Sequence, residues 1–223
     1  MRSEVVEPQG RFKITAPVDV GNTILPCLTA HFLEKYPKVE LDILLTDRRV
    51  DFLDEQVDLA IRAGRLKDSS LIAKKAGEVV FKMYASPQYL KGHGMPRSIK
   101  DISQHMCIHF TSLAKEGWQL KKEKRSLTVP LPKKIVVNNI QLAQNLAIEG
   151  AGLAFLPSFL SASAVKSGTL KPILEQWTST VAPLHFLYPA QKYVSPVVRA
   201  FIELSSEVLK KQFPFIGPKI GGV

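Results

Sequence analysis

The first third of the sequence alternates strand-like and helix-like segments, and this order constrains the fold more than any other feature. Residues 12–16 (FKITA), 39–45 and 57–62 (VDLAIR) are apolar, β-branched runs that are typical of strands. Between the first two runs, apolar side chains recur at helical spacing from Leu25 to Tyr36, and Pro37 ends that helix. Residues 50–56 predict a short second helix. A β-α-β-α-β order favours a parallel sheet with right-handed crossovers.

A second α/β unit is predicted after Ser86-Pro87, which interrupts the strand pattern. Two strands, at 71–76 and 79–85, precede that break. Ser195-Pro196 predicts the start of a last helix, with a capping hydroxyl followed by proline at the first helical position. The other predicted elements are strands at 107–110, 135–137, 153–156 and 184–188, a polar hairpin at 118–122 and 126–131, and helices from 140 to 147 and from 157 to 165.

Composition places the chain among globular proteins. It has 223 residues, of which 45% are hydrophobic and 22% charged. No apolar run approaches the roughly 18 residues that span a bilayer, and the first ten residues lack the apolar core of a secretory signal. We therefore expect a cytoplasmic protein that does not contact membranes. The net charge of +10 is spread over scattered clusters without aromatic neighbours, so it predicts a solvated surface and not a nucleic-acid groove.

No pattern in the sequence indicates catalysis. The motifs of nucleophile elbows, zinc proteases and phosphate loops are missing, and the five histidines lack the spacing of metal ligands. We expect no enzyme activity, no catalytic residue, no metal and no cofactor. Cys27 and Cys107 are interpreted as two reduced, buried thiols, and a redox-sensing pair is the alternative.

Several stretches in a fixed order resemble the ligand-sensing domain of LysR-type transcriptional regulators over about residues 10–211. They carry apolar strands, helix stops and glycine turns in the order found in that family. The stretches are Gly10-Arg11-Phe12, Thr15-Ala16-Pro17, Leu25-Pro26, FLEKYP at 32–37, 39–45, VDLAIRA at 57–63, SSLIA at 69–73, YASPQYL at 84–90, GAGLAFLP at 150–157 and 184–188.

The resemblance implies an α/β fold like that of periplasmic solute-binding proteins, with two Rossmann-like subdomains joined by two crossover strands. The segments 79–85 and 184–188 are the expected crossovers. Subdomain I is then expected to comprise residues 10–85 and 186–212, and subdomain II residues 86–185. Residues 1–9 and 213–223 are expected to be flexible ends.

The implied function is effector sensing and oligomerisation in a DNA-binding transcriptional regulator. The family also carries an N-terminal winged helix-turn-helix, for which there is no room before residue 10, so we expect a fragment that contacts promoter DNA only through that missing part. Two alternatives remain open. One is a free-standing solute-binding protein of a transport system, and the other is a dimerisation module with an empty cleft.

The expected ligand site lies in a cleft between the subdomains, beyond the carboxyl ends of strands and near helix N-termini. Several of its residues also have structural interpretations: Arg62 could pair with a neighbouring carboxylate, Arg48 could be a solvated charge, Asn139 could only cap a helix, and Phe155 could belong to the core. The expected ligand-binding residues are Pro17, Val18, Thr46, Arg48, Arg62, Phe110, Thr111, Asn139 and Phe155.

One departure from the family concerns the start of the first helix, where many relatives hold a ligand carboxylate with Ser or Thr. Here the sequence is Ala16-Pro17-Val18, and proline has no N–H group. An acid ligand would have to use the backbone of residues 18–20 or an arginine. The expected effector is a small organic acid or an aromatic compound.

Self-association into a dimer or tetramer is also implied by the resemblance. In the family, the helix at about residues 20–35 pairs with the helix at 140–149 of another protomer in antiparallel fashion. Apolar residues outside the core would form that interface, and the expected ones are Ile24, Leu28, Leu142 and Leu146.

Overall fold

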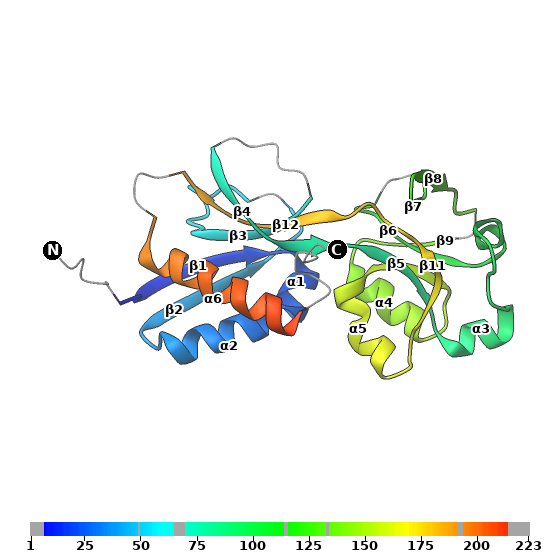
Figure 1. The fold of residues 1–223 in the computed structure, drawn as a ribbon, viewed down its shortest axis with the longest axis horizontal. Helices are drawn as coiled ribbons and strands as arrows, with labels where there is room; N and C mark the ends of the chain where they lie inside the picture. Colours follow the sequence, from blue (N-terminus) through cyan, green and yellow to red (C-terminus); the bar gives the residue numbers. More distant parts are fainter. Residues whose placement is uncertain are drawn as a thin grey trace. The chain divides into compact units, whose positions relative to one another are not determined.

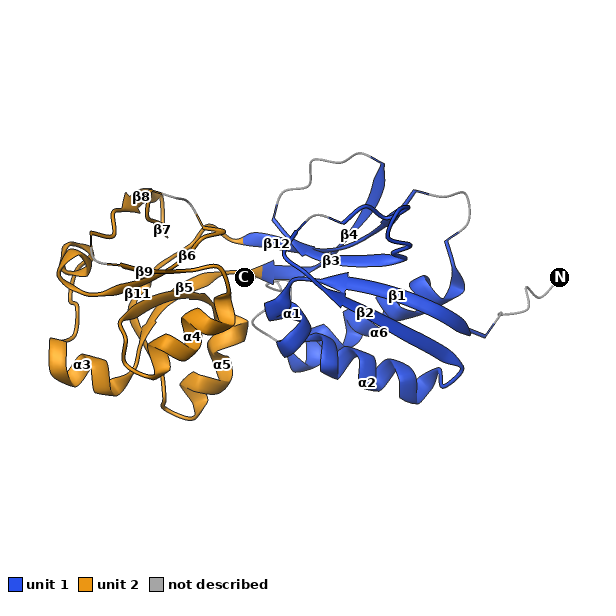
Figure 2. Cartoon of the chain, turned by 180° about the vertical axis from the view of Figure 1, so that it is seen from behind, with its two compact units in different colours: residues 1–78, 182–223 blue, residues 79–181 orange. Residues whose placement is uncertain are grey.

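The computed structural model describes residues 7–48, 50–64, 70–113, 116–132, 134–190 and 194–213. The chain forms two compact units, one made of residues 1–78 and 182–223 and the other of residues 79–181 (Figure 2). The expected flexible ends fall mainly on residues 1–6 and 214–223, which lie outside the described residues.

Unit 1 is built on a five-stranded mixed sheet with the order β2-β1-β3-β12-β4. β1 pairs in parallel with both β2 and β3, and β12 runs antiparallel to β3. The carboxyl ends of β1, β2 and β3 therefore lie at one edge of the sheet. The strands are β1 (Gly10–Ala16), β2 (Val39–Leu45), β3 (Leu59–Ala63), β4 (Leu71–Val79) and β12 (Ala182–Pro189).

Two helices, α2 (Leu25–Lys35) and α6 (Pro196–Gln212), lie side by side against this sheet (Figure 1). The two helices and the sheet meet at Phe12 of β1, Phe32 of α2 and Phe201 of α6, each at most 1% exposed. The ring centroids of Phe12 and Phe201 lie 5.3 Å apart, and those of Phe32 and Phe201 lie 5.1 Å apart. Such aromatic packing supplies much of the burial energy of a small core.

Unit 2 has a seven-stranded sheet with the order β8-β7-β11-β5-β10-β6-β9, in which β10, β6 and β9 are parallel neighbours. The strands are β5 (Phe81–Ala85), β6 (Cys107–Phe110), β7 (Trp118–Lys122), β8 (Arg125–Val129), β9 (Lys134–Val137), β10 (Leu153–Pro157) and β11 (Lys171–Thr178). The helices are α3 (Pro87–His93), the 3-10 helix η1 (Ile99–Gln104), α4 (Ile140–Ile148) and α5 (Ser158–Lys166).

The border between the units precedes β5, whereas the sequence placed it after Ala85. β5 belongs to unit 2 because it pairs with β10 and β11. The chain therefore passes from the sheet of unit 1 to that of unit 2 between β4 and β5, and it returns between β11 and β12.

One local prediction was wrong, and two others hold only in part. Residues 50–56 form turns and not a helix, because the Asp51 carboxylate accepts hydrogen bonds from the amides of Leu53 and Asp54. The first helical region is divided into α1 (Val18–Thr23) and α2, and Pro26 lies in the first turn of α2. Ser195 precedes α6, but its side chain makes no capping hydrogen bond.

Candidate functional site

Arg62, at the end of β3, connects β1 to the loop after β2 at the carboxyl edge of the unit 1 sheet. Its Nη1 donates to the carbonyl oxygen of Thr46 at 2.6 Å. Its Nη2 donates to the hydroxyl of Thr15 at 3.2 Å and to the carbonyl oxygen of Arg48 at 3.3 Å. All three acceptors are uncharged, so within the described residues no carboxylate bonds to this guanidinium. The alternative interpretation of Arg62, an ion pair with a neighbouring carboxylate, is therefore wrong for the described residues, which surround it with neutral acceptors.

The half-buried position of Arg62 affects its charge. Burial lowers the pKa of its guanidinium, while the negative charge of Asp47 nearby opposes that change. Arginine stays protonated at any accessible pH, so the unit keeps a cation at this edge with N–H groups left over from the three bonds.

The start of α1 is occupied by the chain's own carboxylates. The amide of Val18 donates to Asp47 at 3.3 Å, and the amide of Val20 donates to the side chain of Asp19 at 2.8 Å. Pro17, which precedes the helix, has no N–H to offer. The backbone of residues 18–20, expected to receive an acid ligand, is thus already engaged by Asp19 and Asp47.

The position of Asp19 changes the pKa of its carboxyl group. Burial raises its pKa to about 6, the charge of Asp47 adds to that effect, and the hydrogen bond from Val20 opposes it. The edge of unit 1 therefore combines the guanidinium of Arg62 with the carboxyl group of Asp19, whose pKa is raised to about 6.

Arg48 lies on the same edge and forms a two-point ion pair with Glu55. Its two terminal nitrogens each lie 2.7 Å from one carboxylate oxygen. The arginine side chain is 61% exposed, so this pair adds little stability but fixes the direction of the guanidinium. Thr46 is half-buried beside it, and its hydroxyl accepts a hydrogen bond from the Arg48 amide.

Unit 2 brings together three of the expected residues at the ends of neighbouring parallel strands. Phe110 ends β6 opposite Val137 of β9, and the amide of Thr111 donates to the carbonyl oxygen of Val137 at 2.9 Å. Asn139 caps α4, and its side chain accepts a hydrogen bond from the Leu142 amide at 2.9 Å. The capping interpretation of Asn139 is therefore confirmed, and the Thr111 side chain is exposed.

Three other expected site residues lie in the protein core. Phe155 is 2% exposed, and its ring lies 5.6 Å from both Phe81 and Trp118, so it packs within unit 2 instead of facing a ligand. Ile24 and Leu28 are 1% and 0% exposed, which leaves no side-chain surface for a partner. Leu142, by contrast, is 47% exposed, and Leu146 is half-buried.

Thr15, Asp19 and Glu55 were not recognised as site residues from the sequence. Thr15 is completely buried and alternates with apolar residues in β1, so it reads as part of the core. Asp19 lies in the first turn of α1, and this position next to a helix start was the signal that could have identified it.

Neither cysteine forms a disulfide, and the two lie in different units. Burial raises the pKa of Cys107 to about 12, which keeps it a thiol. Cys27 is partly exposed instead of buried, and its Sγ donates to Gln212 at 2.9 Å. Among the described residues there is no group of three or more side chains that could hold a metal ion, and none of the helices could cross a membrane.

Comparison with known proteins connects these features to one family. The sequence model of the LysR substrate binding domain matches residues 6–210. The HTH-type transcriptional regulator PtxR of Pseudomonas aeruginosa is 33% identical, over 94% of this chain and 67% of its own length.

Solved structures agree with this match. The regulatory domain of CrgA, a LysR-type transcriptional regulator from Neisseria meningitidis, is 28% identical with a TM-score of 0.82, over 91% of this chain and all of that chain. Full-length AphB, the Vibrio cholerae virulence activator, is 25% identical with a TM-score of 0.79, over 92% of this chain and 70% of that one.

The two α/β units have the architecture of these regulatory domains, a fold like that of periplasmic binding proteins. These relatives and structural neighbours are transcriptional regulators. The chain belongs to the LysR substrate-binding domain family, whose members are the effector-binding regulatory domains of LysR-type transcriptional regulators.

Proposed function

We propose that the carboxyl edge of the unit 1 sheet binds the effector of this regulator, with Arg62 as the main contact. The observation that carries the proposal is the set of bonds around Arg62, which involves only uncharged oxygen atoms. A guanidinium has five N–H donors, so an anionic or carbonyl group can bond to those that remain. The same bonds connect Arg62 to β1 and to the loop after β2, so a ligand that moves it acts on both segments.

The effector is a small organic acid or an aromatic compound. Its acid group contacts Arg62 and not the start of α1, because Asp19 and Asp47 already accept the amide protons there. Pro17 and Val18 contribute apolar contacts, and Thr46 and Arg48 contribute polar ones. In unit 2, Phe110, Thr111 and Asn139 form the corresponding edge, where the exposed Thr111 hydroxyl is the best donor.

Signalling proceeds by a shift in population between arrangements of the protomers, which requires that the effector bind one arrangement more tightly than another. The protomers form a dimer or a tetramer, with Leu142 and Leu146 of α4 at the interface. Promoter DNA is bound by a winged helix-turn-helix of the full regulator, in the cytoplasm.

The test is a thermal-stability screen of small carboxylates and aromatic compounds, since a specific ligand stabilises the folded state by mass action. Arg62→Lys keeps the charge but loses the planar fork, so we expect the affinity of a bound carboxylate to fall at least about tenfold. Arg11→Lys is the matched control, because Arg11 is an exposed arginine at the opposite end of β1, paired with Asp42.

Two results would contradict the proposal. Equal ligand affinity in wild type and Arg62→Lys would mean that Arg62 does not contact the ligand. Failure of every compound to stabilise the protein at millimolar concentration would favour a dimerisation module without an effector.

A further inference from the structure

A cavity in unit 1 lies at the end of its strands opposite to the carboxyl edge. It has a volume of about 310 Å³, within the range of small-molecule sites, although at its lower end. Its described lining comes from the turns before β3, the end of β12 and the start of α6. These residues are Phe52, Leu53, Gln56, Val57, Asp58, Tyr188, Pro189, Val194, Ser195 and Val198.

The cavity is separate from the carboxyl edge. Asp58 directly precedes β3, whereas Arg62 lies near the other end of that strand. At about 3.3 Å per residue, four residues of strand place the two about 13 Å apart. Tyr188 and Pro189 end β12, which runs antiparallel to β3, so they lie at the same end as Asp58.

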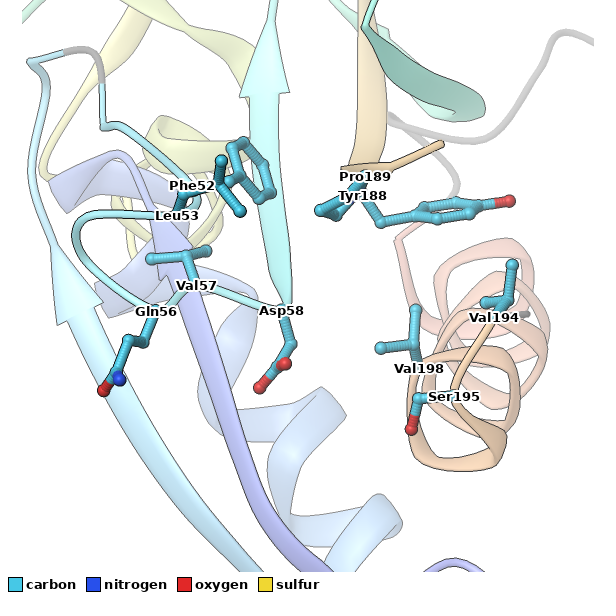
Figure 3. Close-up of a pocket in the computed structure, with 10 residues that line it drawn as sticks. All are labelled: Phe52, Leu53, Gln56, Val57, Asp58, Tyr188, Pro189, Val194, Ser195 and Val198. Atoms are coloured by element: carbon cyan, nitrogen blue, oxygen red, sulfur yellow. The ribbon is translucent and has the colours of Figure 1, made fainter. Parts of the chain in front are cut away.

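The walls of the cavity are mainly apolar. Figure 3 shows Phe52 and Val57 on one side and Pro189 and Val198 on the other. Leu53, at the tip of the turn, is 80% exposed, an unusual position for a large apolar side chain. Such walls favour an aromatic or branched aliphatic group.

Asp58 is the one charged side chain among the described lining residues. Its Oδ2 accepts a hydrogen bond from the Lys13 amide at 2.8 Å, which joins the start of β3 to β1. Its Oδ1 has no hydrogen bond, and Asp58 forms no ion pair within the described part of the chain. An apolar cavity with one carboxylate is complementary to an organic cation.

We propose that this cavity binds a small primary amine with an aromatic or branched apolar tail. The ammonium group bonds to Oδ1 of Asp58, and the tail lies between Phe52, Val57 and Val198. β3 and β12 connect this site to the edge that carries Arg62. An amine bound here is therefore a second input to the regulator, in addition to the acid or aromatic effector at Arg62.

The test uses 2-phenylethylamine as the probe, with 2-phenylethanol and phenylacetate as neutral and anionic compounds of similar shape. Binding is followed by amide chemical shifts and by calorimetry. We expect the amine to bind more tightly than either analogue and to shift amides near residues 52–58 and 194–198.

Variants locate the contact. Asp58→Asn keeps an acceptor for the Lys13 amide but removes the charge, so amine affinity should fall about five- to tenfold. Asp54→Asn, an exposed aspartate in the same turn that does not line the cavity, is the matched control and should leave affinity unchanged. If Asp58→Asn fails to fold, Ser195→Phe serves instead, because this exposed side chain makes no capping bond and a larger one would close the cavity.

Amine binding should persist in Arg62→Lys, which separates this proposal from the effector site. Equal affinity for the amine and phenylacetate, shifts confined to other parts of the chain, or no binding at millimolar amine would overturn it.

Discussion

Replacing Asp19 with asparagine should stabilise unit 1 at neutral pH and remove part of the pH dependence of its stability. Burial raises the pKa of Asp19 from its ordinary value of 3.8 to about 6. One pKa unit corresponds to about 1.36 kcal/mol, so the shift amounts to at most about 3 kcal/mol. Because the carboxyl is only partly buried, roughly 1–3 kcal/mol is the expected range.

The sign follows from proton binding. A raised carboxyl pKa means that the folded state holds the proton more tightly than the unfolded state does. The stabilisation from Asp19 is fully present below about pH 3.8 and is lost as the pH rises through about 6. Asparagine stays neutral and can still accept the hydrogen bond from Val20, so Asp19→Asn avoids this loss.

The assay is urea unfolding from about pH 4.5 to about pH 7.5, followed by circular dichroism, to which α1, α2 and α6 of unit 1 contribute more α-helical residues than α3, α4 and α5 of unit 2. Trp118 and Trp177 both lie in unit 2, so tryptophan fluorescence reports that unit separately. We expect the stability difference between variant and wild type to grow with pH, while the exposed control Asp54→Asn shows no such growth. A difference that stays constant over this pH range would refute the reasoning.

Three further predictions concern unit 2 and assembly. Asn139→Ala should destabilise unit 2 by about 1 kcal/mol in urea unfolding, because the Leu142 amide loses its cap; an unchanged midpoint would contradict this. Leu142→Glu should lower the mass measured by analytical centrifugation, whereas Val165→Glu, at a similarly apolar position on α5, should not; a monomeric wild type would defeat the interface proposal. Gly117→Ala should cost more than about 2 kcal/mol, because Gly117 has φ 139° and a Cβ would overlap the Val129 carbonyl, whereas Gly92→Ala in α3 has open space and should be tolerated.

The strands that carry unit 1 were predictable because their side chains are strongly apolar. β2 was predicted with its observed bounds, and the regular spacing of Leu25, Leu28 and Phe32 identified the buried face of α2. β11 was missed because it contains Pro172, Glu175 and Gln176, and its register with β5 shifts where Leu174 takes a φ of 47°. A strand so irregular shows no period of two.

The candidate site was harder to predict than the fold. Arg62 was recognised at its strand end, but its partners are a buried hydroxyl and two backbone carbonyl oxygens, which no pattern in the sequence specifies. The first-helix region looked continuous through Ile24, and only the structure shows that the helix is broken there and that Ile24 lies in the core. Side-chain direction depends on such breaks, so interface residues could not be chosen from spacing alone.

The discontinuity of unit 1 has a consequence for how the protein is made. Unit 2 is one continuous segment, so all of its strands are synthesised before β12. β12 lies between β3 and β4 in the other sheet, and α6 supplies Phe201 to its core. During translation, unit 2 can therefore fold before unit 1 is complete, because the β1–β4 segment of unit 1 still lacks β12 and α6. The nascent β1–β4 segment therefore exposes its apolar face longest. The β1–β4 segment is therefore the part of the nascent chain where a chaperone would be needed most.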